Sequence, residues 1–424
     1  MNFKIPNLKS LVDWQLHLGL IILPLSPFLA AFGLLWMMVN VWRQEFHTII
    51  RRPVNQGFAI LAAGLLVNAY FAQNRGDGFL GLFNFLPFFV LFAAVSALIK
   101  TPAQLRRISW AIGLSAVPVI IIGLGQLFWG WTGPIKLWMA IYFPLEPTGT
   151  PPGRMASVFA YANVLASYLV ITFILTLELW IEQFQKKSFP NFFLSLLVIG
   201  NALALILTHS RNAWAIAFLS CLAFAVYLGW RWLVTAVTAA AGTVLWAAFG
   251  LDPLRQWLRL VVPAYFWKRL TDELHPDRPI AQLRSTQWQF AWDLTLRRPG
   301  TGWGLRNFTT IYEAQMDYWV GHPHNLILML MAETGIIATL WFCGLVGWVL
   351  GKAVLLLGQM KNEDRLIFFS YIVAFGGCSL FHLLDVTLFD ARINILGWLL
   401  LGSIAGIVDN YRGDRMSKGM RMIE

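Results

Sequence analysis

Apolar residues run along this chain in long stretches that short polar segments interrupt. Most stretches approach or exceed the roughly 20 residues that a helix needs to cross a bilayer. They cover residues 11–42, 57–73, 79–99, 108–129, 158–182, 191–208, 213–229, 232–250, 324–350, 366–386 and 391–408. This pattern predicts an all-α fold, a polytopic transmembrane helical bundle.

The first stretch decides the number of spans. At about 1.5 Å of rise per residue it is too long for one crossing. Pro24 and Pro27 interrupt it and can turn it into a hairpin of two short helices. A single helix gives 11 spans for the chain, and a hairpin gives 12.

Basic residues occupy alternate loops, which the positive-inside rule places on the cytoplasmic side. The loops and tails concerned carry Lys4, Lys9, Arg43, Arg51, Arg52, Lys100, Arg106, Arg107, Lys186, Lys187, Arg231, Lys352, Lys361, Arg365, Arg412, Arg415, Lys418 and Arg421. Both termini then lie inside, which requires an even number of spans and favours about 12. The loops at 74–78, 130–157, 209–212, 251–323 and 387–390 face outward by the same alternation.

We expect three parts of the chain: N-terminal transmembrane helices at 1–250, one long extracytoplasmic (periplasmic) loop at 251–323, and C-terminal transmembrane helices with a cytoplasmic tail at 324–424. Within the loop, residues 255–270 mix apolar and basic side chains as in a short amphipathic helix at the membrane interface. Residues 280–298 predict a second helix, which Pro299 and Gly300 end.

Composition excludes an ordinary soluble enzyme, because 58% of the residues are hydrophobic and only 12% are charged, against about 45–50% and about 25% in soluble domains. The net charge of +11 lies in short loops, so it indicates membrane orientation and no nucleic-acid partner. The three cysteines fall inside apolar runs and form no disulfide or CxxC pattern.

His324 stands out among the polar residues, because it lies with Asn325 directly before an apolar run. At a helix N-terminus the dipole disfavours the imidazolium and attracts anions, so a neutral His324 suits a general base. The alternative is an interfacial histidine that only caps the helix. A zinc site from His322 and His324 lacks a third ligand with convincing spacing.

Two arginines can bind an anion. Arg211 lies in the polar break 208–212, where it is either an anion ligand or an interfacial anchor. Arg284 precedes Trp288 and Trp292 at helical spacing, so indole stacking can hold its guanidinium for bidentate phosphate contacts. The alternative for Arg284 is a solvated arginine on an amphipathic helix. Asp385 sits near the outward end of its helix, either in a functional role or neutralising an arginine such as Arg392.

Several segments resemble the O-antigen ligase and O-antigen polymerase superfamily of bacterial membrane glycosyltransferases. The resemblance covers most of the chain from about residue 150, over 153–159 with Asn163, 207–214, 284–288, 298–304 with Phe308, and His324-Asn325 with Gly335. Tyr161-Ala162-Asn163 departs from the Asn-Pro-Asn often found there, and Ala338 also departs. A related branch is described as inorganic-carbon transporters and lacks the histidine that matches His324.

The resemblance implies transfer of a glycan from undecaprenyl diphosphate to an acceptor hydroxyl, on a glycan or glycolipid, without a cofactor, nucleotide sugar or metal. It implies a multi-pass protein of the bacterial cytoplasmic (inner) membrane whose active site faces the periplasm and the surrounding membrane lipid. His324 then takes the acceptor proton, and Arg211 and Arg284 bind the diphosphate. Arg154, Asn325, Asp385 and Arg392 are further substrate-binding candidates.

Two other functions remain open from the residues alone. Outward arginines and buried ionisable groups also suit a small-anion or bicarbonate transporter. A purely structural scaffold has less in its favour, since a scaffold needs no such polar groups at the membrane edge.

Overall fold

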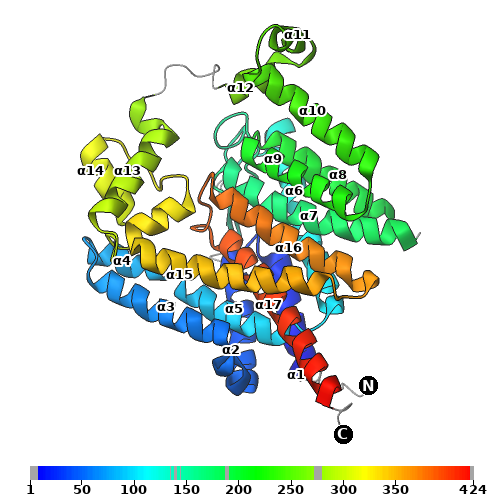
Figure 1. Ribbon diagram of the computed structural model, residues 1–424, viewed down its shortest axis with the longest axis vertical. Helices are drawn as coiled ribbons and strands as arrows, with labels where there is room; N and C mark the ends of the chain where they lie inside the picture. The colour runs from blue at the N-terminus through cyan, green and yellow to red at the C-terminus, as the bar shows by residue number, and fades with distance from the viewer. Residues whose placement is uncertain are drawn as a thin grey trace. The chain divides into compact units, whose positions relative to one another are not determined.

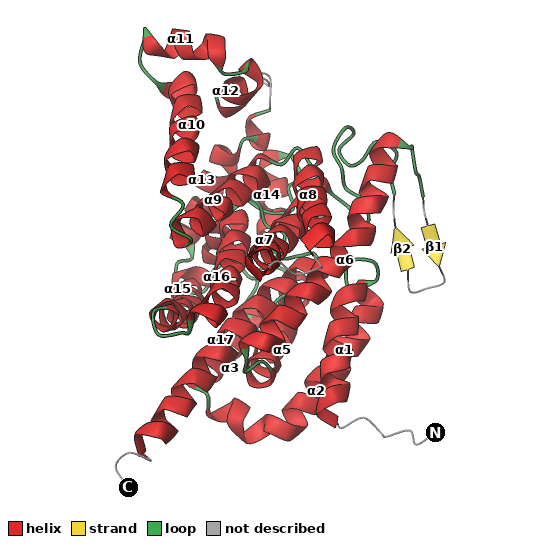
Figure 2. Cartoon of the chain, turned by 90° about the vertical axis from the view of Figure 1, so that its right-hand side faces the viewer, coloured by secondary structure: helices red, strands yellow, loops and turns green. Residues whose placement is uncertain are grey.

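The computed structural model describes residues 8–133, 135–137, 141–143, 145–186, 191–271 and 279–420. Helices make up most of this part of the chain, so the predicted helical bundle is confirmed (Figure 1). A small antiparallel hairpin, β1 (Ile135–Leu137) with β2 (Ile141–Phe143), was not predicted (Figure 2). The basic residues at 4, 187 and 421 lie outside the described residues.

The helices follow the apolar stretches. The first half of the chain forms α1 (Leu8–Ile22), α2 (Pro27–Arg51), α3 (Pro53–Tyr70), α4 (Arg75–Leu82), α5 (Leu86–Leu98), α6 (Pro102–Phe128), α7 (Ala162–Lys186), α8 (Asn191–Leu207) and α9 (Arg211–Tyr227). The second half forms α10 (Arg231–Phe249), α11 (Leu254–Val261), α12 (Ala264–Leu270), the 3-10 turn η2 (Ile280–Gln282), α13 (Arg284–Arg297), α14 (Asn307–Met316), α15 (Leu326–Leu357), α16 (Asn362–His382) and α17 (Ala391–Met420).

The first apolar stretch is a hairpin, as its prolines predict. α1 ends at Ile22, and α2 begins at Pro27 after Ser26, whose hydroxyl accepts a hydrogen bond from Leu29 N. Among the described residues, seven helical segments are long and apolar enough to cross a membrane, and α8 and α9 are shorter apolar helices. The protein is therefore polytopic, and the figure of about 12 spans stays a prediction.

The chain forms two compact units: residues 1–217 with 290–424, and residues 218–289. These limits differ from the predicted boundaries at 250/251 and 323/324. Those boundaries separate membrane helices from the extracytoplasmic loop, and they stay predictions. The first unit contains all helices from α1 to α8 and from α14 to α17. The second contains α10, α11, α12 and η2.

The centre of the first unit consists of α7 and α17. The most apolar 18 residues of these helices are 83% and 89% buried, respectively. α17 packs closely on α5 because it presents glycines there. A Cβ atom at Gly406 would meet the carbonyl oxygens of Ile99 and Ser96, and one at Gly402 would lie 3.0 Å from Val95. Small residues permit such close helix approach in a membrane, where packing replaces the hydrophobic effect.

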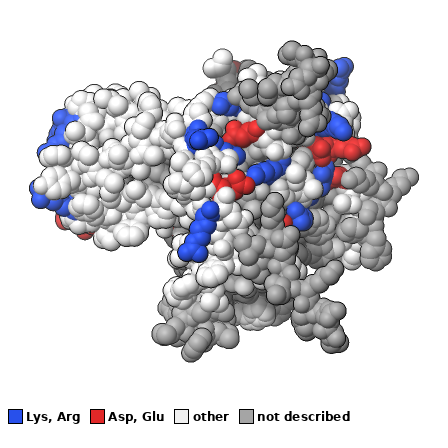
Figure 3. Space-filling model, turned by 90° about the horizontal axis from the view of Figure 1, so that it is seen from below, with Lys and Arg blue, Asp and Glu red and all other residues white. Residues whose placement is uncertain are grey.

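Ion pairs join the basic loops at one end of the first unit. Arg52, after α2, pairs with Asp409 of α17 at 3.3 Å. Arg106, at the start of α6, pairs with Asp364 of α16 at 3.2 Å and with Glu182 of α7 at 2.9 Å. The loops that the positive-inside rule assigns to one side therefore do meet. In the view from below, basic and acidic side chains lie together, and a wide area beside them carries almost no charge (Figure 3).

α15 is broken at Gly335, which has φ 84° and ψ 166°. Segment 299–304 supplies the hydrogen bonds that the break removes. Trp303 N donates to Ala332 O at 3.0 Å, Gly304 N donates to Glu333 O at 2.8 Å, and Ile336 N donates to Pro299 O at 2.8 Å. The glycine-rich segment 298–304 therefore stabilises the break in α15 through these hydrogen bonds.

We expect Gly335→Ala to lower the free energy of unfolding by about 2 kcal/mol or more, because an L side chain at this φ is strained. Its Cβ would also lie 2.5 Å from Gly300 O. Gly344→Ala in the same helix is the control: its Cβ meets nothing within 4 Å, and removing a helical glycine gains about 1 kcal/mol. Thermal unfolding in detergent measures both. Equal midpoints for the two variants would contradict the role of the break.

In the second unit, the predicted single amphipathic helix 255–270 is wrong in one respect, because it is two helices, α11 and α12. Pro263 separates them, since it has no N–H and favours the extended backbone seen at Val262 (ψ 123°). Arg259 donates to Ala247 O and stacks on Trp267, 4.1 Å from the ring centre. The apolar side chains of α11 remain exposed, including Trp257 and Leu260, as suits a helix at a membrane interface.

Candidate functional site

His324 is held just outside the N-terminus of α15. Asn325 is the N-cap of this helix, and its Oδ1 accepts a hydrogen bond from Leu328 N at 3.0 Å. His324 has φ 54°, a left-handed conformation that is uncommon for residues other than glycine. Such backbone strain concentrates at functional sites, where the surrounding structure maintains it.

Asp385 holds the imidazole of His324. It lies between α16 and α17, and its Oδ1 is 2.9 Å from His324 Nδ1 and 3.7 Å from His322 Nε2. The same oxygen accepts from Val386 N, and Oδ2 accepts from Asn163 Nδ2 at 2.6 Å. The Asp385 side chain is 7% exposed and that of His324 is 32% exposed, so the histidine is the accessible member of the pair.

The hydrogen-bond chain continues from Asp385 to the segment that carries Arg211. Arg154 donates from Nη2 to Asn163 Oδ1 and from Nε to Thr208 O, at 2.8 Å for the latter. Thr208 lies three residues before Arg211. Arg154 therefore positions Asn163 as well as the turn before α9. Asn163 was not predicted as a site residue, although it belongs to a family-like segment of the sequence.

The environment of Asp385 keeps its carboxylate ionised. Burial alone would raise the pKa of Asp385, but the hydrogen bond and charge of His324, together with His322 and Asn163, hold that pKa well below its usual range. A carboxylate at Nδ1 favours the tautomer with hydrogen on Nδ1 and the lone pair on Nε2. His324 is thus arranged to accept a proton at Nε2, in the same way as the histidine of a catalytic triad.

His322, His324 and Asp385 together could also hold a metal ion, since their ligand atoms lie within 4.8 Å of one another. Spacing along the chain indicates no third ligand, but in the fold Asp385 offers one. However, His322 Nδ1 accepts a hydrogen bond from His324 N at 3.1 Å, so the hydrogen of a neutral His322 is on Nε2, the atom that faces Asp385. Histidine ligands normally donate from the ring nitrogen that does not bind the metal. The geometry therefore fits a hydrogen-bonded network better than a metal centre.

The two anion-binding candidates are placed differently. Arg211 is the exposed first residue of α9 in the first unit, where the helix dipole adds to its positive charge. The predicted helix 280–298 is the 3-10 turn η2 followed by α13. Arg284 begins α13, with Trp288 and Trp292 in the same helix, but it belongs to the second unit. The structure therefore connects the turn before Arg211 to His324 through Arg154, and the convergence of Arg211 and Arg284 on His324 stays a prediction.

Two of the substrate-binding candidates, Arg392 and Asn325, make hydrogen bonds within the protein. Arg392 is 9% exposed and binds Asp390 through Nε and Nη2, while its Nη1 donates to Pro24 O and Val158 O. Asn325 uses both polar atoms of its side chain, on Leu328 N and on Leu383 O. These contacts hold Arg392 to the loops at Pro24 and Val158 and make Asn325 a helix cap, and substrate binding by either residue stays a prediction.

No curated protein matches the chain. Residues 193–343 match the family model of the O-antigen ligases. The matched segment runs from α8 into α15 and contains Arg211, Arg284 and His324, whereas Asp385 and Arg154 lie outside it. The match covers about a third of the chain and, together with the polytopic helical fold, supports membership of the O-antigen ligase superfamily.

Proposed function

We propose that this protein transfers a glycan from undecaprenyl diphosphate to an acceptor hydroxyl, in the manner of an O-antigen ligase or polymerase. The observation that carries the proposal is the pair of Asp385 and His324, with Oδ1 and Nδ1 2.9 Å apart and the imidazole half-buried. The family match supports an O-antigen ligase-like role in polysaccharide biosynthesis. It gives no support to the anion-transporter alternative.

In the proposed reaction His324 Nε2 takes the proton of the acceptor hydroxyl. The acceptor oxygen forms a bond with the anomeric carbon of the glycan, and the bond between that carbon and the diphosphate oxygen breaks. The electron pair leaves with the lipid diphosphate. Asp385 stabilises the imidazolium that forms, without being protonated itself. One direct displacement inverts the configuration at the anomeric carbon.

An apolar pocket beside this pair suits the isoprenoid part of the carrier. It has a volume of about 370 Å³ and lies between α15, α16 and α17. Leu326 lines it two residues after His324, and Leu383 and Leu388 line it on either side of Asp385. A lipid chain in this pocket would bring its diphosphate to the edge where the histidine lies.

We propose that Arg211 and Arg284 neutralise the charge that develops on the leaving diphosphate. Arg211→Gln and Arg284→Gln should each slow transfer about 10- to 100-fold, because a hydrogen bond to a charged group contributes about 1.5–3 kcal/mol. Arg284→Lys should recover only part of the rate if the contact is bidentate. Arg255→Gln is the matched control, since this half-buried arginine pairs locally with Asp252. Wild-type rates for both Arg211→Gln and Arg284→Gln would contradict these roles.

The deciding experiment is incubation of the purified protein with a polyprenyl-diphosphate glycan and candidate acceptors: a lipid A core, a second lipid-linked glycan and a protein. We expect the carrier to be released as polyprenyl diphosphate and the glycan to appear on one acceptor, which separates ligase from polymerase activity. An intact carrier with every acceptor, together with anion uptake by proteoliposomes, would overturn the proposal.

We further propose that the protein resides in the bacterial cytoplasmic membrane with His324 on the periplasmic side. Two observations support this orientation: the basic loops meet at one end of the first unit, and His324 and Asp385 lie in loops of the other set. The lipid-linked glycan and its acceptor would then meet outside the cytoplasm.

A further inference from the structure

A polar pocket lies at the C-terminal end of α3. It has a volume of about 600 Å³, which is within the range of small-molecule sites, about 300–1,000 Å³. Gln73, Asn74 and Arg75 line it from the connection between α3 and α4, and Asn307 and Thr310 line it from α14. The mechanism proposed above uses none of these residues.

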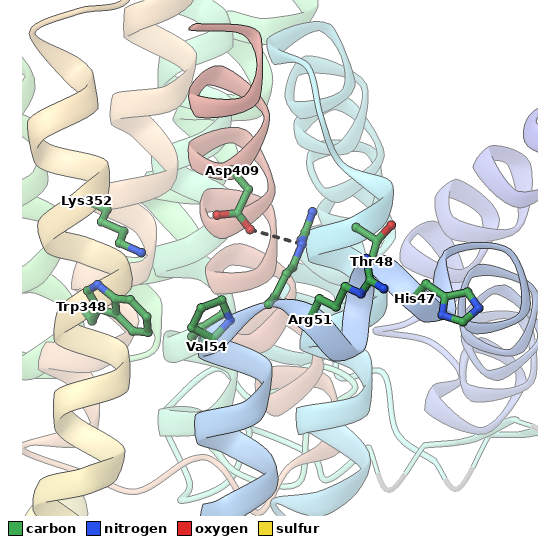
Figure 4. A pocket seen from close by; sticks show the side chains of 9 residues that line it. His47, Thr48, Arg51, Val54, Trp348, Lys352 and Asp409 are labelled. Atoms are coloured by element: carbon green, nitrogen blue, oxygen red, sulfur yellow. Dashed lines mark ion pairs between the residues drawn. The ribbon is translucent and has the colours of Figure 1, made fainter. Parts of the chain in front are cut away.

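The pocket lies at the end of the first unit that is opposite to the basic loops. Figure 4 shows the other end of α3, where Asp409 of α17 pairs with Arg52 at 3.3 Å. α3 has 18 residues, about 27 Å of helix, so the two ends are about one hydrocarbon core apart. In addition, Thr309 Oγ1 of α14 donates to Gly321 O at 2.9 Å. The pocket therefore shares α14 with the loop that leads to His324.

The two walls of the pocket are fixed to each other. The buried side chain of Asn307 accepts a hydrogen bond from Asn74 N at 2.6 Å and donates one to Asn74 O at 3.2 Å. Gln73 N donates to Trp303 O at 3.0 Å, in the segment that stabilises the break in α15. The pocket is thus formed before any ligand binds, which lowers the entropic cost of binding.

Three side chains of the pocket keep their hydrogen-bonding groups available for a ligand. Gln73, Arg75 and Thr310 are exposed, and within the described part of the chain their side chains make no hydrogen bond or ion pair. The guanidinium of Arg75 lies 4.9 Å from the centre of the Tyr70 ring, a cation–π contact that holds it in place. An amide and a hydroxyl can both donate and accept, and a guanidinium adds five donors.

We propose that this pocket binds a sugar unit of a glycan substrate, an inference that rests on the proposed function for the kind of ligand. Each hydroxyl of a sugar donates and accepts a hydrogen bond, and the side chains of Gln73 and Thr310 match both capacities. Arg75 donates to the sugar oxygens. A phosphate only accepts and would leave the acceptors of Gln73 and Thr310 unused, which favours the sugar. His324 does not line the pocket, so the bound unit lies further along the glycan than the reacting one.

The test measures by fluorescence anisotropy the dissociation constants of two labelled oligosaccharides for the detergent-purified protein. One is the core oligosaccharide released from lipid A, and the other is the glycan released from polyprenyl diphosphate. We expect saturable binding of at least one, and its identity shows whether the acceptor or the donor occupies the pocket. A polyethylene glycol oligomer of similar length should not bind, because it has no hydroxyl groups along its chain. Failure of both oligosaccharides to bind would overturn the proposal.

Variants connect the binding to this pocket. Gln73→Ala and Thr310→Val should each weaken binding about fivefold, and Arg75→Gln about 10-fold, because a hydrogen bond from a charged group contributes more than one from a neutral group. These exposed side chains make no hydrogen bond within the described residues, so we expect the variants to fold. Arg297→Gln is the matched control, since this exposed arginine ends α13 and does not line the pocket. Unchanged affinity in the double variant Arg75→Gln with Thr310→Val, or an equal loss in the control, would overturn the proposal.

Binding and transfer can fail separately. Weaker binding by Arg75→Gln together with no transfer by the wild type would support the sugar site and contradict the proposed function. Where the wild type transfers, Arg75→Gln should raise the KM of the bound substrate about 10-fold, because the interaction is the same in the ground state and the transition state. A lower kcat with an unchanged KM would contradict a site for a sugar unit that does not react.

Discussion

Replacement of His324 should reduce glycan transfer about 10²- to 10⁴-fold, the usual contribution of a general base. Without the imidazole no group of this dyad can take the acceptor proton, because Asp385 is buried behind the histidine. His324→Ala removes the base, and His324→Asn removes it while suiting the left-handed backbone that the residue adopts. The rate of transfer from a polyprenyl-diphosphate glycan measures the effect.

Two observations would separate a lost base from a damaged fold. The His324→Asn variant should unfold thermally close to the wild-type midpoint and should still bind the lipid-linked glycan. Added imidazole should restore part of the rate of His324→Ala by replacing the missing group. A His324→Asn variant that is folded and transfers at the wild-type rate would disprove the role of the histidine.

Asp385→Asn should slow transfer about 10²- to 10³-fold although it changes only one atom of the side chain. The carboxylate accepts from three donors, His324 Nδ1, Val386 N and Asn163 Nδ2. An amide nitrogen in place of Oδ2 loses the hydrogen bond from Asn163, and one in place of Oδ1 loses those from His324 and Val386. Loss at His324 frees the imidazole to rotate or to adopt the other tautomer, which removes the lone pair from Nε2.

The effect of Asp385→Asn on the free energy of unfolding should depend on pH. The pKa of Asp385 is lowered in the folded state, so its ionised form stabilises the fold above the ordinary carboxyl pKa, about 4. Asp385→Asn should cost about 1.5–3 kcal/mol at neutral pH. The difference from wild type should narrow as the pH falls below about 4, because the carboxyl of the unfolded chain takes up a proton there while the native carboxylate stays ionised. Asp317→Asn is the control, an exposed aspartate in the left-handed conformation that asparagine tolerates.

Much of the fold can be predicted from the sequence because the bilayer requires long apolar helices. The stretches between charged loops became helices, and Pro24 and Pro27 marked the hairpin of α1 and α2. The break at Gly335 could not be predicted, since a lone glycine in a long apolar helix is common and its partners, residues 299–304, are distant in the chain. The division of 255–270 by Pro263 was missed because the amphipathic composition continues across it.

The site was predictable only in part. His324 and Asp385 were both identified, one from its position before a helix and the other as an ionisable group at the membrane edge, but their pairing across 61 residues is a property of the fold. Asn163 and Arg154 act through their contacts with each other, which no local pattern indicates. Arg392 was a substrate-binding candidate and a possible partner of Asp385, whereas in the fold its guanidinium is bound by Asp390.

The break in α15 makes the position of His324 independent of the thickness of the bilayer. Residues 336–357 after Gly335 form about 33 Å of helix, enough by themselves to cross a hydrocarbon core of about 30 Å. In a thinner or thicker membrane this part can tilt to match the lipid. The short part before Gly335 stays attached to segment 299–304, so His324 should keep its orientation toward Asp385 in membranes of different lipid composition.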